Sequence, residues 1–370
     1  MSTLQELIRY CGEYDYPGAL LLTGEMGCGK TYLIDKELSE ALRDTYYVVR
    51  VSLLGVHSIE ALNEAARKQW LLACMPYLVK LDQRKDQLKK NGGLINAINS
   101  VIYSINPVAG NVASTVVSFD PLEYIRLEPE VEDLHNPGEK KRVVLVFDDL
   151  ERSKLDLVEL MGCINEFSEN KGFKTIVVAD ERAILAKVLE RNSKNSFAEY
   201  KMIKEKTIVR TILYIPDYQA IVHDIVSRTK WPSMDYAFFL TENERIIRDV
   251  FGVEVPKQED RLGKHHNLRS LNCALREFYR IYAFLTENHV RDRERYLYSF
   301  VAYILVSRNG IYKDGYTCYE VSEEDIKQLY SEYSSDTVPP SIRQWSDYGI
   351  WDEGRIAREL SVQSGEKEKR

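Results

Sequence analysis

The stretch GALLLTGEMGCGKTYLIDKELSEALR, residues 18–43, joins an apolar run to a helical pattern through a glycine-rich turn. The turn matches G-x-x-x-x-G-K-[ST] in full, and Lys30 and Thr31 are its last two residues. Glycines let the backbone curl so that successive N–H groups point at phosphate oxygens, and the following helix adds the positive end of its dipole. This match, placed between a strand and a helix, predicts a phosphate-binding loop.

The loop also predicts which residues contact a nucleotide. Lys30 is expected to neutralise charge on the outer phosphates, and the Thr31 hydroxyl is expected to ligate Mg²⁺. The predicted nucleotide-binding residues are Gly24, Glu25, Met26, Gly27, Cys28, Gly29, Lys30, Thr31 and Tyr32. The alternative, a glycine-rich turn that binds nothing, is disfavoured by the complete match.

A second stretch, VVLVFDDLERSK at residues 143–154, ends an apolar run in a row of acids. Burying carboxylates at a strand end is costly unless a cation lies there, and Mg²⁺ is the cation expected beside a phosphate-binding loop. Asp148 is therefore the predicted magnesium ligand, together with Thr31. Asp149 is favoured over Glu151 as the carboxylate that orients or deprotonates an attacking water, because the two-residue offset of Glu151 at the strand end, or in the turn after it, aims that side chain elsewhere.

The next strand candidate, KTIVVADE at residues 174–181, ends in Asp180. Two roles are open for this side chain. It is either a third polar probe of the γ-phosphate, and hence a further nucleotide-binding residue, or the cap of the helix that follows.

The pattern along the chain predicts alternating strands and helices, followed by helices alone. The expected strands are 18–24, 46–55, 143–147, 174–180 and 207–217, and the expected helices are 31–43, 58–80, 155–170, 267–285 and 296–306. Strands that are nearly continuous apolar runs between helices are typical of a parallel sheet buried on both faces. The predicted fold class is α/β.

Composition and charge restrict the classes of function. A net charge of −7 and a sequence pI of about 5.6 argue against nucleic acid as the primary partner. The six cysteines are scattered without metal-binding spacing, and the N-terminal residues do not match a signal peptide, so a cytoplasmic location is expected.

One short stretch of sequence bears on whether the nucleotide carries guanine or adenine. A GTPase is expected to contain N-K-x-D, but residues 170–173 read Asn-Lys-Gly-Phe, with Phe173 where the aspartate is required. A transporter-type L-S-G-G-Q signature is also missing from the sequence. The expected cofactors are therefore ATP and Mg²⁺.

With both phosphate motifs placed, the chain resembles the KAP family of P-loop NTPases, which belongs with the AAA+ and STAND ATPases. The resembling pieces are GEMGCGKTYLI (24–34), VSLLGVHSIEAL (51–62), VVLVFDDLER (143–152), YKMIKEKTIVRT (200–211) and HHNLRSLNCAL (265–275). The resemblance implies a P-loop NTPase core with strand order 5-1-4-3-2, an α-helical lid and a small helical C-terminal region. The corresponding expected boundaries are 1–216, 217–295 and 296–370, the last with a disordered tail at 364–370.

Two arginines acquire expected roles from this resemblance. Arg269 corresponds to the sensor arginine that reaches the γ-phosphate in related ATPases, and the alternative is a surface arginine at a helix start. Arg152 belongs to a D-D-x-[DE]-R pattern. It either acts on the ATP of a neighbouring subunit or pairs with Glu151, and the ion pair is favoured.

KAP proteins often carry membrane-spanning helices between the two phosphate motifs, and this chain has an insert there, at about 84–138, whose central part is uncharged. Its stretch 91–119 contains no charged residue and follows a basic run. One helical face carries Asn96, Asn99 and Tyr103, which makes the stretch too polar to span a bilayer comfortably. A partner or oligomer surface, internal packing and peripheral membrane contact remain open, and membrane contact is not favoured.

Three functions are compatible with these motifs. The favoured one is an ATP-hydrolysing molecular switch that couples nucleotide state to an effector protein or to a homo-oligomer. The resemblance adds an expected role in prokaryotic defence against phage. The alternatives are a P-loop small-molecule phosphotransferase and a scaffold that binds ATP without turnover.

Overall fold

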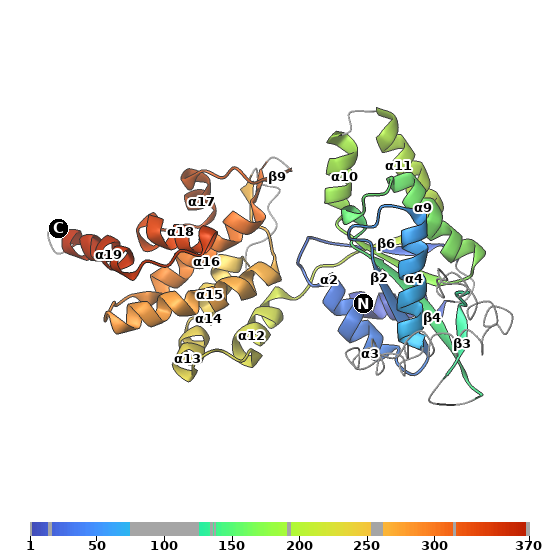
Figure 1. Ribbon diagram of the computed structural model, residues 1–370, viewed down its shortest axis with the longest axis horizontal. Coiled ribbons are helices and arrows are strands. Elements are labelled where there is room, and N and C mark those ends of the chain that lie inside the picture. Colours follow the sequence, from blue (N-terminus) through green and yellow to red (C-terminus); the bar gives the residue numbers. More distant parts are fainter. Residues whose placement is uncertain are drawn as a thin grey trace, which may run out of the picture. The chain divides into compact units, whose positions relative to one another are not determined.

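The computed structural model describes residues 2–13, 17–74, 126–133, 136, 138–190, 194–252, 262–313 and 316–367. The chain divides into two compact units (Figure 1). The first unit contains Met1–Gly24 and Lys30–Tyr214, and the second contains Glu25–Gly29 and Ile215–Arg370.

The first unit is built on a sheet in which five strands run parallel. Its strands are β1 (Ala19–Thr23), β2 (Tyr46–Ser52), β3 (Glu130–Glu132), β4 (Lys140–Asp148), β5 (Lys174–Ala179) and β6 (Ile208–Leu213). The parallel strands are ordered β2-β4-β5-β1-β6, which confirms the expected order 5-1-4-3-2. The sequence pattern does not predict β3, which pairs antiparallel with the start of β4.

Helices cover both faces of this sheet. The helical segments are α1 (Thr3–Gly12), α2 (Lys30–Tyr32), η1 (Leu33–Leu38), α3 (Ser39–Ala41), α4 (Ile59–Cys74), η3 (Leu150–Arg152), α9 (Leu157–Asn165), η4 (Glu166–Asn170), α10 (Glu181–Glu190) and α11 (Lys194–Thr207). Alternate residues of β4 point to opposite faces. Val144 and Val146 pack with α1 and η1, whereas Leu145 and Phe147 pack with α4, α9, α10 and α11. The sheet is therefore buried on both faces, as expected.

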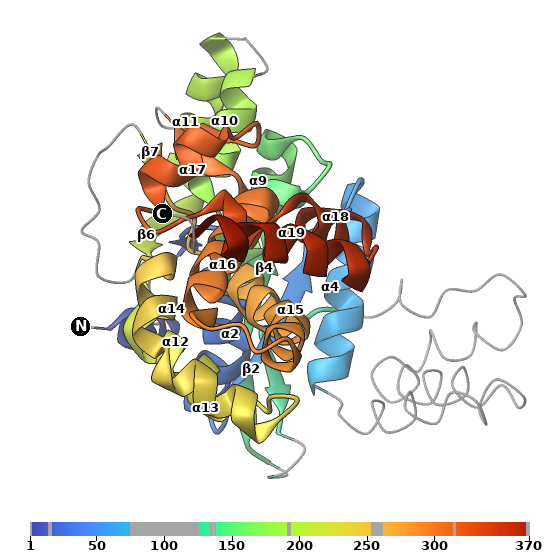
Figure 2. The same ribbon diagram turned by 90° about the vertical axis from the view of Figure 1, so that its left-hand side faces the viewer.

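The second unit is mainly helical. Its elements are α12 (Tyr218–Arg228), α13 (Met234–Glu242), α14 (Glu244–Phe251), β7 (Leu262–Gly263), α15 (Leu268–Glu287), α16 (Arg293–Asn309), β8 (Ile311–Lys313), β9 (Tyr316–Cys318), α17 (Glu323–Leu329), η5 (Ser335–Thr337), α18 (Pro340–Tyr348) and α19 (Glu353–Lys367). Helices α15 and α16 pack side by side within it (Figure 2). The helix expected at 267–285 is confirmed as α15.

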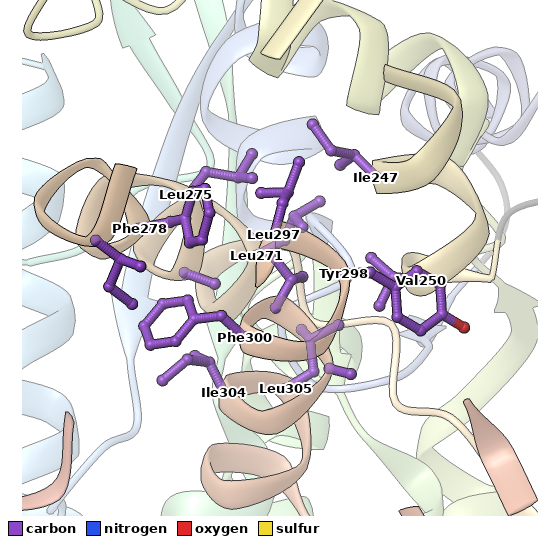
Figure 3. Close-up of a cluster of buried hydrophobic side chains, with 14 of the residues drawn as sticks. Ile247, Val250, Leu271, Leu275, Phe278, Leu297, Tyr298, Phe300, Ile304 and Leu305 are labelled. Carbon is purple, nitrogen blue, oxygen red and sulfur yellow. The ribbon is translucent and has the colours of Figure 1, made fainter. Parts of the chain in front are cut away.

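One hydrophobic core joins the helices of the second unit, from Val222 in α12 to Leu360 in α19. Figure 3 shows its centre, where Leu271 and Phe278 of α15 lie near Phe300 of α16. Complete burial of such a side chain contributes about 1.5–3 kcal/mol. Helix α16 runs through the expected boundary between residues 295 and 296, and the division of this unit into a lid and a C-terminal region stays a prediction.

Two expectations concern segments near the limits of the described residues. Helix α19 extends to Lys367, within the stretch 364–370 for which a disordered tail is expected, and that expectation stays a prediction. The stretch 91–119 lies outside the described residues, and its role stays a prediction. Among the helices that the structure describes, none combines the length and the apolar character needed to cross a membrane.

Candidate nucleotide and magnesium site

The phosphate loop turns sharply between β1 and α2. Gly27 and Gly29 have φ angles of 77° and 100°, in the region that side-chain-bearing residues rarely adopt. Lys30 begins α2 and is buried, and its ammonium donates a hydrogen bond to the Gly24 carbonyl at 2.7 Å. The loop therefore has the backbone conformation and the buried cation that a phosphate cradle requires.

The structure brings the two predicted magnesium ligands together. The Thr31 hydroxyl donates to Asp148 Oδ2 at 2.9 Å, and Asp148 Oδ1 accepts from the backbone N–H of Asp149 at 2.9 Å. Burial raises the pKa of the Asp148 carboxyl, whereas the Thr31 hydrogen bond lowers it. A hydroxyl and a carboxylate are hard oxygen donors of the type that Mg²⁺ prefers, so this pair fits the ion.

The protein supplies few ligands to this site. In the part of the chain that the structure describes, no group of three or more histidine, cysteine, aspartate or glutamate side chains is placed to hold a metal. Magnesium commonly keeps several waters and takes only one or two carboxylates from a protein, the remainder coming from substrate phosphates. The Thr31–Asp148 pair agrees with that pattern of coordination.

Asp149 has an unusual backbone conformation, with φ 62° and ψ 41°. Its carboxylate accepts a hydrogen bond from Ser52 Oγ at 3.4 Å and forms an ion pair with Arg152 Nε at 3.4 Å. The expected pairing of Arg152 with Glu151 is therefore wrong. The left-handed conformation starts the short helix η3 at Asp149, which brings the residue three positions later beside it.

Glu151 instead connects the ends of two neighbouring strands. Its side chain is buried, and Oε2 accepts a hydrogen bond from the backbone N–H of Asp180 at 3.1 Å. The Lys187 ammonium donates to the Glu151 carbonyl oxygen. Burial raises the pKa of the Glu151 carboxyl, and the backbone hydrogen bonds and the charge of Lys30 oppose that rise.

Asp180 caps helix α10. Its Oδ1 accepts from the backbone N–H groups of Arg182 at 3.1 Å and Ala183 at 3.3 Å. This is the capping arrangement that was open from the sequence. A contact with the γ-phosphate stays a prediction.

Arg50 is a member of this site that the sequence patterns do not predict. It lies in β2, and its guanidinium contacts Asp148 Oδ2 at 3.3 Å and Asp35 Oδ1 at 2.9 Å. The available signal was a charged residue inside the strand sequence YYVVRVS. A basic side chain on a half-buried strand requires an acidic partner, but the sequence does not say which one.

In the second unit, the start of α15 contacts the loop residues Glu25–Gly29. The Leu268 N–H donates to the Gly27 carbonyl at 3.1 Å, and the His266 N–H donates to Glu25 Oε2 at 3.3 Å. Arg269 follows Leu268 and is exposed. Its role as a sensor of the γ-phosphate stays a prediction, as do the nucleotide contacts of the loop side chains.

The comparison with protein-family models agrees with this geometry. The family model described as the KAP family P-loop domain matches residues 2–285, which is more than half of the chain. No curated protein matches the sequence.

Two similar solved structures show only distant likeness. One is Drosophila ORC bound to GC-rich DNA and Cdc6, with 13% identity and a TM-score of 0.33, covering 99% of this chain and 47% of that one. The chain thus spans about half the length of that protein. The other is a DNA replication initiation factor, with 13% identity and a TM-score of 0.29, covering 98% of this chain and 92% of that one. The chain belongs to the KAP family of P-loop NTPases.

Proposed function

We propose that this protein binds ATP with Mg²⁺, hydrolyses it, and acts as a molecular switch. The hydrogen bond from Thr31 to Asp148 carries this proposal. It joins the end of the phosphate loop to the end of β4 across 117 residues of sequence. A hydroxyl held against a buried carboxylate beside a glycine-rich loop is the arrangement that P-loop enzymes use for the metal of a nucleotide.

Each residue at the loop has a task in this proposal. The backbone N–H groups of the loop and the Lys30 ammonium bind phosphate oxygens. Thr31 and Asp148 would hold Mg²⁺, which supplies positive charge at the phosphates when it is bound. Arg269, next to the residue that contacts Gly27, would report nucleotide state to the helical unit.

Asp149 is the proposed water-positioning residue. Asp149 directly follows Asp148, the last residue of β4. Its carboxylate is partly exposed, so water has access to it. Its left-handed backbone supports a functional role, because conformations of this kind cluster at active sites. Glu151 is the rival, but its carboxylate accepts the Asp180 N–H and supports the neighbouring strand end.

The structure also supports adenine over guanine as the base. Phe173, which replaces the aspartate of the guanine motif, is buried in the core against Phe167. Phe173 therefore has a packing role and cannot supply the carboxylate that the guanine motif requires. ATP is the proposed substrate.

Coupling to an effector protein or to further copies of this chain completes the proposal. Membership of the family supports the proposed role in defence against phage. No contact among the described residues bears on that role. Light scattering with and without ATP tests the oligomer and the action of Arg152 on a neighbouring nucleotide. A monomer in both states contradicts them.

The central experiment measures phosphate release from ATP by the purified protein and by three variants. Lys30→Ala is expected to abolish turnover, and Asp149→Asn is expected to reduce it by about 10²- to 10⁴-fold. Glu151→Gln keeps a side chain that accepts the Asp180 N–H and is expected to remain within about tenfold of the parent.

The same assay separates the other functions. Equal hydrolysis by the parent and Lys30→Ala contradicts the proposal. Turnover that requires an added phosphate acceptor indicates a phosphotransferase. Saturable ATP binding without any turnover indicates a scaffold.

A further inference from the structure

Arg50 lies on the same face of the sheet as the predicted magnesium ligands. In the parallel pairing of β2 with β4, Arg50 is opposite Val146, and Ser52 is opposite Asp148. Val146 packs in the core that η1 covers. The Arg50 side chain therefore projects toward the helix that follows the phosphate loop.

The guanidinium of Arg50 lies between two carboxylates. Its NH1 donates to Asp148 Oδ2 at 3.3 Å, and its Nε donates to Asp35 Oδ1 at 2.9 Å. Asp35 follows Thr31 by one helical turn, so both side chains lie on one side of that helix. Asp148 is 3% exposed, whereas the Asp35 side chain is 40% exposed.

The contact of Arg50 with Asp148 uses the oxygen that also accepts from Thr31, the other predicted magnesium ligand. Asp148 Oδ2 accepts from Thr31 and from Arg50, and Oδ1 accepts from the Asp149 N–H. A carboxylate oxygen offers about two lone-pair positions. Thr31 and Arg50 thus fill both positions on Oδ2, the Asp148 oxygen that lies beside the Thr31 hydroxyl.

We infer that Arg50 is the counter-cation of Asp148 before the metal binds, and that it must leave Asp148 for Mg²⁺ to bind. This inference rests on the proposed function. A buried carboxylate without a cation is costly, so Arg50 stabilises the metal-free site. Asp35 still binds the guanidinium after the guanidinium leaves Asp148, since the two ion pairs use different nitrogens. The pair Arg50 and Asp35 therefore sets the concentration of Mg²⁺ at which the site fills.

The inference predicts opposite effects for the two members of the pair. Arg50→Gln removes a competitor for Asp148, so the half-saturating Mg²⁺ concentration is expected to fall about tenfold. Asp35→Asn removes the second carboxylate that binds Arg50 once it has left Asp148. The half-saturating Mg²⁺ concentration is therefore expected to rise several-fold. In the double variant, the effect of Asp35→Asn is expected to disappear, because it acts through Arg50.

The experiment measures the thermal unfolding midpoint during titration with Mg²⁺, at one fixed concentration of a non-hydrolysable ATP analogue. Binding of a ligand to the folded state raises this midpoint, so no turnover is required. Arg210→Gln is the matched control. Arg210 is also partly buried and pairs with Glu6 and Glu13, but it lies in β6. It is expected to leave the half-saturating concentration unchanged.

Different results identify different failures. A half-saturating concentration that is unchanged or higher in Arg50→Gln overturns the inference, as does an unchanged or lower one in Asp35→Asn. If Arg50→Gln does not fold, Asp35→Asn decides alone. If the analogue and Mg²⁺ do not stabilise even the parent protein, the proposed function falls and the inference falls with it.

Discussion

The two units of the molecule bury different kinds of side chain. Among the described residues, every buried charged side chain lies in the first unit: Lys30, Asp133, Lys141, Asp148, Glu151 and Asp180. In the second unit, the buried polar side chains within the described ranges are hydroxyls: Ser270, Ser299, Thr337 and Ser341. Its core is formed by aromatic and aliphatic residues such as Phe278 and Phe300.

This difference separates chemistry from packing. A buried charge costs free energy unless a partner compensates it, so a protein keeps one mainly where it has a task. Four of the six buried charges lie at the carboxyl ends of β1, β4 and β5 or just beyond them, and the ends of parallel strands are where α/β proteins bind ligands. The helical unit depends instead on the fit of its side chains.

The largest expected effect is on the core of the helical unit. Phe278→Ala is expected to lower the free energy of unfolding of this unit by about 3–5 kcal/mol, because it leaves a cavity in a fully buried position. Urea unfolding followed by tryptophan fluorescence measures it, since Trp231, Trp345 and Trp351 report on this unit.

Phe238 of α13 provides the matched control for that variant. Its side chain is 61% exposed, so Phe238→Ala is expected to change the free energy of unfolding by at most about 0.5 kcal/mol. Equal effects of the two substitutions would contradict the packing role of the buried ring.

The next largest effect is on the metal pair of the sheet unit. Thr31→Val removes the hydroxyl that donates to Asp148, and phosphate release is expected to fall at least about 100-fold. Thr31→Ser keeps a hydroxyl and is expected to stay within a few-fold of the parent. Similar rates of phosphate release for the valine and serine variants would show that the Thr31 hydroxyl has no role in the metal site.

A smaller effect is expected at the start of α15. Asn267 Oδ1 accepts from the N–H groups of Arg269 and Ser270, so Asn267→Ala is expected to cost about 1–2 kcal/mol of stability. Asn267→Asp keeps the accepting oxygen but loses the donation to Asn309, and it is expected to recover part of the loss. Chemical denaturation tests both, and an alanine variant as stable as the parent contradicts the cap.

The smallest effect tests the cost of one buried charge. Burial raises the pKa of Glu151 above its ordinary value of 4.5, so the folded state binds this proton more tightly than the unfolded state does. The stability from this proton is present below about pH 4.5 and is lost as pH rises through the folded-state pKa. Glutamine does not ionise, so the Glu151→Gln variant does not lose stability in this way as pH rises.

Glu151→Gln should therefore unfold at a higher temperature than the parent at pH 8, and the difference should shrink as pH falls toward 4. Thermal unfolding at a series of pH values measures it. A difference that does not depend on pH would show that the carboxyl titrates alike in both states.

Much of the fold was predictable because its signals are local. The phosphate loop is a contiguous motif, and the strands of the sheet are short apolar runs, so their order and type follow from periodicity and from the family pattern. Strand β3 was not predictable in this way. It has only three residues, and it exists because β4 offers them unpaired backbone groups.

The site was predictable in part. Thr31 and Asp148 each belong to a recognisable motif, and they meet as expected. The partner of Arg152 was wrongly predicted, because it depends on the left-handed φ of one residue, Asp149. Aspartate tolerates that conformation better than most residues, but its presence in a sequence does not require it.

By itself, the sequence determined the phosphate loop, the acidic end of β4 and the alternation of the main strands and helices, since each is a pattern of neighbouring residues. Only the tertiary structure decided which carboxylate meets which cation. Arg50 and Asp148 are 98 residues apart and meet because β2 pairs with β4 in one particular register. A strand pattern specifies the face of a side chain, whereas its partner across the sheet depends on the register, which the packed fold sets.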